Sequence, residues 1–123
     1  MNLNKVYSAP IYKALKSMGN YFLCVFKEMP TYGKEYVGKE MSHMIIDLIK
    51  KFIKVYHLEK GENRNSLLIE MYDEILSFET YLEICHGGQL MSVKKEAVLG
   101  ENISDIKRQM SLWMKSNGVI IDS

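Results

Sequence analysis

Apolar residues recur at spacings of three and four in four separate segments of the chain, and this is the period of an α-helix. No segment shows the two-residue alternation of a half-buried β-strand, so the pattern predicts an all-α protein. The predicted helices span about residues 9–28, 34–58, 65–86 and 92–116. Short connections require consecutive helices to run antiparallel. We therefore predict an up-down-up-down antiparallel four-helix bundle, as a single domain over residues 1–123.

The helical spacing also identifies the residues expected in the core. In chain order they are Ile11, Leu15, Met18, Phe22, Val25, then Val37, Met41, Met44, Leu48, Phe52, Val55, then Leu68, Met71, Ile75, Phe78, Leu82, Cys85, and finally Leu99, Ile103, Ile106, Met110, Trp113. Ser8 and Ser92 are suitable N-cap residues. The first helix should end before Pro30, because proline disfavours helix in the preceding residue, and residues 31–33 are predicted as a turn.

Several predicted helices carry a second set of apolar residues away from the core stripe. These residues are Tyr12, Ile45, Ile46, Ile49, Tyr72, Leu76 and Tyr81. A helix of a monomeric bundle needs only one buried face. The second set therefore predicts a subunit interface in a homo-oligomer, while an apolar monomer surface stays open as the alternative.

The formal net charge of +1 conceals an uneven distribution along the chain. Residues 1–60 hold ten Lys/Arg and five Asp/Glu (+5), residues 61–92 hold one and six (−5), and residues 93–123 hold five and four (+1). Such sorting predicts a molecule with faces of opposite sign.

No apolar run approaches the length that spans a bilayer, so no membrane association is expected. The first five residues lack the apolar core of a secretion signal, which predicts a cytoplasmic protein. In that reducing compartment Cys24 and Cys85, which both lie in apolar stretches, are expected to be unpaired thiols packed as small apolar residues.

The strongest indication of an enzyme is a repeated Glu-x-x-His motif, at Glu40–His43 and Glu83–His86. Di-iron four-helix proteins use two such motifs together with one Glu from each remaining helix. At 100° per residue, however, His43 points away from the core, and the first helix offers no carboxylate at the same level. We therefore expect no metal, no cofactor, no catalytic residue and no enzymatic activity.

The remaining chemical feature is a set of basic residues at helical spacing on three of the predicted helices. They are Lys13, Lys16, Lys50, Lys51, Lys54, Lys107 and Arg108. Lysines three or four apart share a helical face, and a basic face that is repeated around an oligomer would bind RNA or DNA with little sequence preference. Ordinary solvated lysines are the alternative. The acidic third helix should then face away from phosphate, or meet the basic helix of a neighbouring subunit.

Short motifs along nearly the whole chain resemble one known family. They are Ala9-Pro10-Ile11-Tyr12-Lys13, Glu28-Met29-Pro30, Tyr36-Val37-Gly38-Lys39-Glu40, Val55-Tyr56-His57 and the closing segment Ile106–Ser116, which contains Trp113-Met114-Lys115-Ser116. The chain resembles the accessory variability determinant (Avd) proteins of diversity-generating retroelements, which belong with the four-helix proteins encoded by intervening sequences in 23S rRNA genes. The segment Met44-Ile45-Ile46-Asp47-Leu48, in place of Asn-Ile-Ala-Glu-Gly, favours the retroelement branch.

The resemblance implies a homopentamer without enzymatic activity that binds a reverse transcriptase together with its RNA or cDNA. It would thereby assist mutagenic retrohoming, the copying of a template repeat into a variable gene. The alternative is a structural oligomer or protein-interaction adaptor of the 23S rRNA intervening-sequence type, without nucleic-acid binding. The residues alone yield neither the number of subunits nor the polymerase partner.

Overall fold

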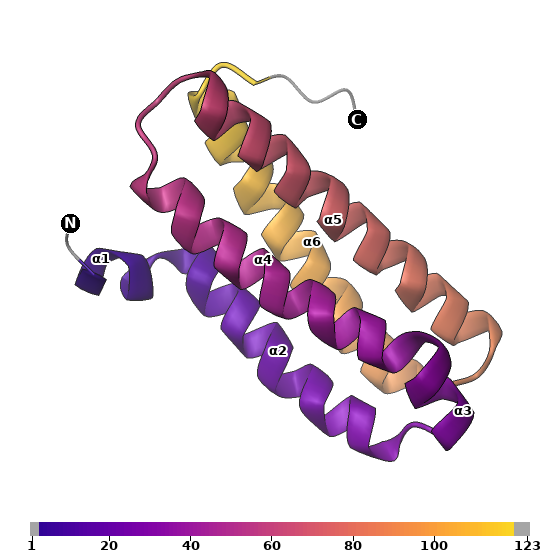
Figure 1. Ribbon diagram of the computed structural model, residues 1–123. Helices are drawn as coiled ribbons and strands as arrows, with labels where there is room; N and C mark the ends of the chain where they lie inside the picture. The colour runs from indigo at the N-terminus through magenta and orange to yellow at the C-terminus, as the bar shows by residue number, and fades with distance from the viewer. Residues whose placement is uncertain (1–2, 120–123) are drawn as a thin grey trace.

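The computed structural model describes residues 3–119, and this part of the chain is helical with no strand (Figure 1). In chain order the elements are α1 (Leu3–Ser8), α2 (Pro10–Glu28), α3 (Thr31–Gly33), the π-helical turn η1 (Lys34–Gly38), α4 (Lys39–His57), α5 (Glu62–Gly87) and α6 (Val93–Ser116). The prediction of an all-α protein is confirmed. The short helix α1 was not expected from the apolar spacing.

The four long helices contact one another as neighbours around a closed circuit. Helix α2 contacts α4 and α6, and helix α5 contacts the same two helices, so α2 lies diagonally across from α5, and α4 from α6. In Figure 1 the α4–α5 connection, α1 and the end of α6 lie at one end of the molecule. Helix α3 and the α5–α6 connection lie at the other end (Figure 1).

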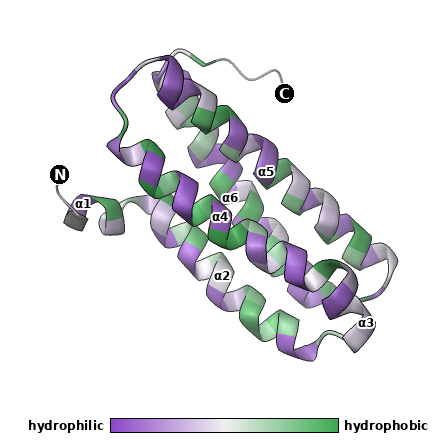
Figure 2. Cartoon of the chain, in the orientation of Figure 1, coloured by the Kyte–Doolittle hydropathy of each residue, from purple (hydrophilic) through white to green (hydrophobic). Residues whose placement is uncertain are grey.

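The core consists of apolar residues from all four long helices, together with Val6, Met29, Val37 and Leu90. Figure 2 shows hydrophobic stretches, in green, along the long helices. All of the predicted core residues are buried except Leu82 and Trp113, which are half-buried. Met114 is buried beside Trp113. The Phe22 and Phe78 rings meet edge to face across the α2–α5 diagonal, with their centroids 6.0 Å apart. Such aromatic pairs add about 0.5–1.5 kcal/mol to the stability gained by burial.

Two local predictions at helix starts have opposite outcomes. Ser92 is the N-cap of α6 as predicted, because its hydroxyl accepts a hydrogen bond from the Lys95 amide at 3.2 Å. The prediction for Ser8 is wrong: Ala9 occupies the N-cap position of α2. Ser8 ends α1 instead, and its hydroxyl donates to the carbonyl of Lys5 at 3.1 Å, since the chain before it is already helical.

The predicted turn at residues 31–33 is also wrong, because the chain is helical there. Pro30 is the N-cap of α3, and its carbonyl accepts a hydrogen bond from the amide of Lys34 at 3.0 Å. Proline disfavours helix only in the residue before it, and its fixed φ suits the start of a new one. The π-helical turn that follows brings Gly38 against Phe26, where an added Cβ would lie 2.9 Å from the ring. Glycine is required there for this close approach.

None of the helices in residues 3–119 combines the length and the apolar composition that crossing a membrane requires.

Candidate nucleic-acid interface

Four of the seven predicted basic residues are exposed and lie on two helices that contact each other. Lys13 and Lys16 are on α2, and Lys50 and Lys54 are on α4. None of these four side chains forms an ion pair within the described part of the chain. Exposed ammonium groups without an internal partner are available to bind phosphate.

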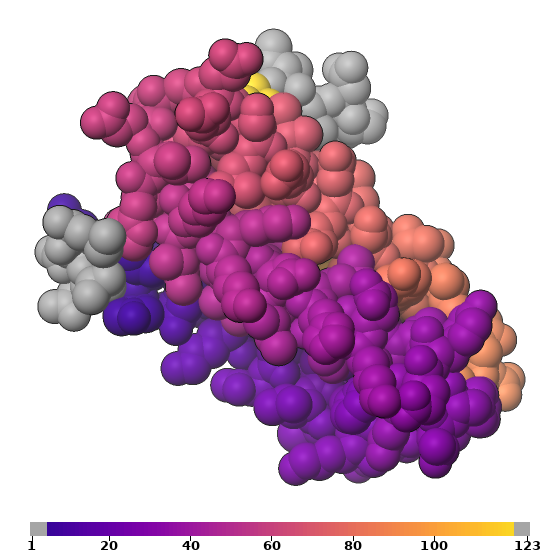
Figure 3. All heavy atoms as spheres, viewed as in Figure 1, coloured from indigo at the N-terminus to yellow at the C-terminus, as the bar shows by residue number. Residues whose placement is uncertain are grey.

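Three of the four lysines also lie at similar heights along the molecule, whereas Lys54 is one turn further along α4 and lines a hollow beside Glu70 of α5. The Tyr12 and Phe52 rings are 6.4 Å apart, and a Cβ on Gly19 would lie 3.3 Å from Ile45, so residues 12–19 of α2 run beside residues 45–52 of α4. Lys13 and Lys16 fall within the first stretch, and Lys50 falls within the second. Figure 3 shows α4 at the front of the molecule, with α2 along its edge.

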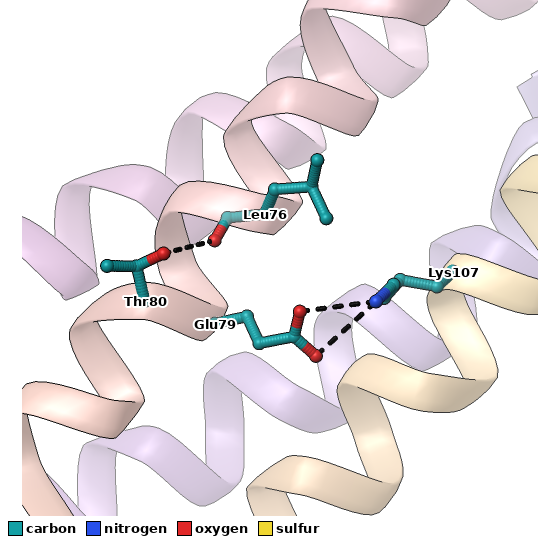
Figure 4. Close-up of polar contacts among 4 residues, drawn as sticks. All are labelled: Leu76, Glu79, Thr80 and Lys107. Atoms are coloured by element: carbon teal, nitrogen blue, oxygen red, sulfur yellow. Dashed lines mark hydrogen bonds and ion pairs between the residues drawn. The ribbon is translucent and has the colours of Figure 1, made fainter. Parts of the chain in front are cut away.

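The three other predicted residues are held in ion pairs. The ammonium of Lys51 lies 3.5 Å from a carboxylate oxygen of Glu74 on α5. Lys107 donates to both carboxylate oxygens of Glu79, at 3.2 and 3.5 Å, across the α5–α6 contact (Figure 4). Arg108 pairs with Asp105, one turn earlier on the same helix.

The position of α6 separates its basic residues from those of α4. Because α6 lies diagonally across from α4, Lys107 and Arg108 do not join Lys50 and Lys54 on one face. The structure therefore places Lys13, Lys16 and Lys50 on neighbouring stretches of α2 and α4. Lys54 is exposed at the α4–α5 groove beside Glu70, and the other three predicted residues pair with carboxylates.

An apolar groove of about 220 Å³ lies beside Lys16, between α2 and α4. Its lining residues are Lys16, Gly19, Asn20, Phe22, Leu23, Ser42, Ile45, Ile46 and Ile49. Gly19 and Ser42 leave this space because they are small, and the Ser42 hydroxyl turns back to the carbonyl of Gly38. Leu23 and Ile46 are 57% and 50% exposed at the groove. A basic, partly apolar surface of this kind suits contact with another macromolecule.

Helix α5 presents the opposite charge. Its exposed side combines Glu70, Asp73 and Glu83 with the exposed apolar residues Ile69 and Leu76. Glu74 lies in the α4–α5 contact, where burial raises its pKa above the usual 4.5 although the charge of Lys51 acts to lower it. The acidic helix thus neutralises cations of α4 and α6 on its flanks and leaves free carboxylates on its outer side.

The two Glu-x-x-His motifs do not converge. Glu40, His43, Glu83 and His86 are all exposed, and the Nδ1 of His86 lies 2.7 Å from a carboxylate oxygen of Glu96. Among residues 3–119, no three side chains of the types His, Cys, Asp and Glu are grouped so that they could hold a metal ion.

The two cysteines differ in their surroundings. Cys85 is buried as expected, its thiol lies 3.7 Å from the sulfur of Met41, and burial together with the charge of Glu96 raises its pKa to about 11. The expectation that Cys24 is buried is wrong, because its side chain is exposed. Cys24 lies on the side of α2 that faces away from the core stripe, although its neighbours in sequence are apolar.

Sequence reasoning missed an aromatic cluster at the end of the molecule where the α4–α5 connection lies. Phe52 contacts Tyr12, Tyr56 and Trp113, with ring centroids 6.4, 5.8 and 5.6 Å apart, and the Arg64 guanidinium lies 5.3 Å from the Trp113 ring centroid. A signal existed, since Phe52 and Trp113 are predicted core residues and Tyr56 follows the predicted core residue Val55. Only the packing of four helices brings these residues together.

Comparison with known proteins assigns no family: no family model, curated protein or solved structure matches the chain. The structure of residues 3–119 shows only the general class of the protein. It is a helical protein with exposed lysines on α2 and α4 and an acidic helix α5.

Proposed function

We propose that this chain is a non-enzymatic, nucleic-acid-binding accessory protein that assists a retroelement reverse transcriptase in mutagenic retrohoming in the cytoplasm. One observation carries the nucleic-acid part of the proposal: Lys13, Lys16, Lys50 and Lys54 are exposed on two adjacent helices, and none forms an ion pair with another residue that the structure describes. The polymerase partner and the retrohoming role rest on the resemblance to Avd proteins.

Binding would act through the phosphate backbone. Lysines that neutralise phosphates release condensed counterions, which favours association at low salt and reads no base sequence. An accessory protein that must accept any template sequence benefits from this property, because its affinity then does not depend on which bases are copied.

We further infer that the four long helices form an up-down-up-down bundle and that the protein is a homo-oligomer, with five subunits by resemblance. The short α4–α5 and α5–α6 connections and the circuit of helix contacts support the topology. Charge complementarity supports the oligomer, since the α2–α4 groove is apolar and basic and the outer side of α5 is apolar and acidic. Two different surfaces that meet head to tail generate a ring when the rotation closes.

The same groove favours the second candidate function. If the lysines only support contacts between subunits, the protein is a structural oligomer or protein-interaction adaptor that binds no nucleic acid. The exposed Leu23 and Ile46 support this alternative, because apolar contact area serves protein association rather than phosphate binding.

The deciding measurement is the fluorescence anisotropy of labelled RNA, DNA and RNA–DNA hybrid with the protein at low and moderate salt. We expect binding that weakens steeply with salt, and we expect Lys50→Glu with Lys54→Glu to weaken it for every sequence. Each phosphate contact contributes about 0.9 to the slope of log affinity against log salt, so loss of two contacts should lower the slope by about 2.

The matched control is Lys27→Glu with Lys94→Glu, which changes the net charge equally. Both residues are exposed, and they lie near the opposite end of the molecule, where Glu28 pairs with Lys95. The control pair should change affinity much less than the α4 pair. Equal losses for the two double variants would show that net charge alone matters, and no binding at low salt would leave the structural oligomer as the better account.

A further inference from the structure

A small pocket opens at the end of the molecule where all four long helices contribute a wall. Its lining residues are Ala9, Pro10, Ile11, Phe52, Tyr56, Arg64 and Trp113. Its volume is about 150 Å³, and its lining residues are apolar apart from Arg64 and Tyr56, which carries a phenolic hydroxyl. An apolar cavity of about this volume is large enough to hold a single six-membered aromatic ring.

Arg64 is the only charged side chain that lines this pocket. Its guanidinium lies over the Trp113 ring at 5.3 Å, which is a cation–π contact. Its Nε is buried and has no hydrogen-bond partner in the described part of the chain. That Nε is shielded from a ligand in the pocket, but the positive charge of the guanidinium that lines it would stabilise a carbonyl oxygen brought to Arg64.

The chemistry of the walls selects the class of ligand. A free phosphate would lose its hydration against the rings of Phe52, Tyr56 and Trp113, and one guanidinium would be its only partner. The pocket requires a ligand that contacts its aromatic walls and also offers a hydrogen-bond acceptor to Arg64. A flat ring with carbonyl groups does both, because its faces contact the aromatic side chains and its carbonyl oxygens accept hydrogen bonds from the guanidinium. Protein sites that bind unpaired bases combine stacking and edge recognition in this way.

We propose that this pocket binds a single unpaired pyrimidine base of a single-stranded nucleic acid, between Tyr56 and Trp113 and with its carbonyl edge toward Arg64. The proposal rests on the nucleic-acid binding inferred above and adds a base-binding subsite to it. Lys13 follows Pro10 by three residues, about one helical turn, so a phosphate held by Lys13 lies one turn from the pocket.

The chain supplies its own reporter, because Trp113 is its only tryptophan. The experiment titrates the protein with labelled oligothymidylate and follows the anisotropy of the label and the Trp113 emission in parallel. An abasic oligomer of equal length keeps every phosphate and removes every base. We expect quenching of Trp113 that saturates with the anisotropy signal for oligothymidylate, and no quenching for the abasic oligomer.

Two variants and one control separate stacking from general binding. Tyr56→Leu removes an aromatic wall, and Arg64→Lys keeps the charge while losing the planar guanidinium. Each variant should lower the affinity for oligothymidylate about tenfold and leave the affinity for the abasic oligomer unchanged. Tyr36→Leu, at an exposed tyrosine outside the pocket, should change neither. Thermal melting identifies a variant that fails to fold.

The outcomes distinguish this inference from the proposed function. If anisotropy shows salt-dependent binding with equal affinity for the two oligomers and Trp113 is not quenched, the proposal that the pocket binds a base is overturned. The proposed function would still stand. Absence of any anisotropy change would overturn the proposed function. A titration with free thymidine then tests the pocket independently, since quenching reduced by Tyr56→Leu would support a base site and unchanged emission would refute it.

Discussion

The basic residues predicted to bind nucleic acid differ between the two sides of the molecule in whether they form ion pairs. On α2 and α4, four lysines are exposed and form no ion pair within the described residues. On the other side, Lys107 is held by Glu79 and Arg108 by Asp105. Of the seven residues predicted to bind nucleic acid, only those four form no ion pair within the described residues, although Lys94 and Lys115 of α6, outside that set, are exposed as well. A count of basic residues along a chain therefore overestimates the binding surface wherever an acidic helix lies alongside.

The apolar residues follow the same division. The groove between α2 and α4 leaves Leu23 and Ile46 half exposed beside Lys16, whereas α5 leaves Ile69 and Leu76 beside carboxylates. The two surfaces are complementary in charge and similar in polarity. This relationship would allow one copy of the chain to contact the next through two different faces.

The largest expected effect breaks this contact at the groove. Leu23→Glu with Ile46→Glu would remove two apolar side chains from the proposed subunit interface and place carboxylates opposite those of α5. Each buried apolar side chain contributes about 1.5–3 kcal/mol, so the association constant should fall by roughly a hundredfold or more. Sedimentation velocity measures the change.

A control for the groove variant uses residues of similar exposure elsewhere. Leu112→Glu with Tyr36→Glu adds the same charge at exposed side chains that do not line the groove. This control should keep the wild-type mass. A groove variant with wild-type mass would show that subunits meet through another surface.

A second effect, of comparable size, is the difference in reactivity between the thiols of α2 and α5. Cys24 is exposed, whereas Cys85 is buried and has a pKa of about 11. Only the thiolate is nucleophilic, so Cys85 should react with a thiol reagent at pH 8 at least about a hundredfold more slowly than Cys24. The raised pKa means that its thiolate fraction increases only as the pH approaches 11.

Cys24→Ser isolates the reaction of Cys85, and denaturant should restore an ordinary rate to it. Fast labelling of Cys85 in the native Cys24→Ser protein would show that the core around Met41 opens readily.

The smallest expected effect is on the melting temperature, and it concerns the half-buried Glu74, which pairs with Lys51. Burial raises the pKa of Glu74 in the folded protein, so its protonated form is favoured by folding. The resulting stabilisation is present below the unfolded pKa and is lost as the pH rises through the folded pKa. Glu74→Gln should therefore raise the melting temperature slightly at pH 7, and this gain should shrink as the pH falls toward 4.

Glu83→Gln is the matched control, because Glu83 is exposed on the same helix and forms no ion pair in the described residues. It should leave the melting temperature nearly unchanged. A lower melting temperature for Glu74→Gln at pH 7 would mean that attraction to Lys51 outweighs the loss of hydration.

Much of the helical core could be predicted from the sequence, because burial along a helix has a local period of 3.6 residues. Residues such as Leu15, Leu48 and Ile106 lie where that period places them. The same reasoning failed for Ser8 and for residues 31–33, where the chain forms helix outside the long apolar stripes. Short helices of this kind bury too few residues to show a period.

The apolar spacing and the charge sorting by themselves determined the helical class and the acidic character of the third long helix. Only the tertiary structure decided that Lys51 and Lys107 are neutralised, that Cys24 is exposed, and that Tyr56, Arg64 and Trp113 share one pocket. The physical reason is that a helical period places a side chain around its own axis. Which carboxylate or ring it meets depends on the rotation and height of a neighbouring helix, and these are set by packing across the whole core.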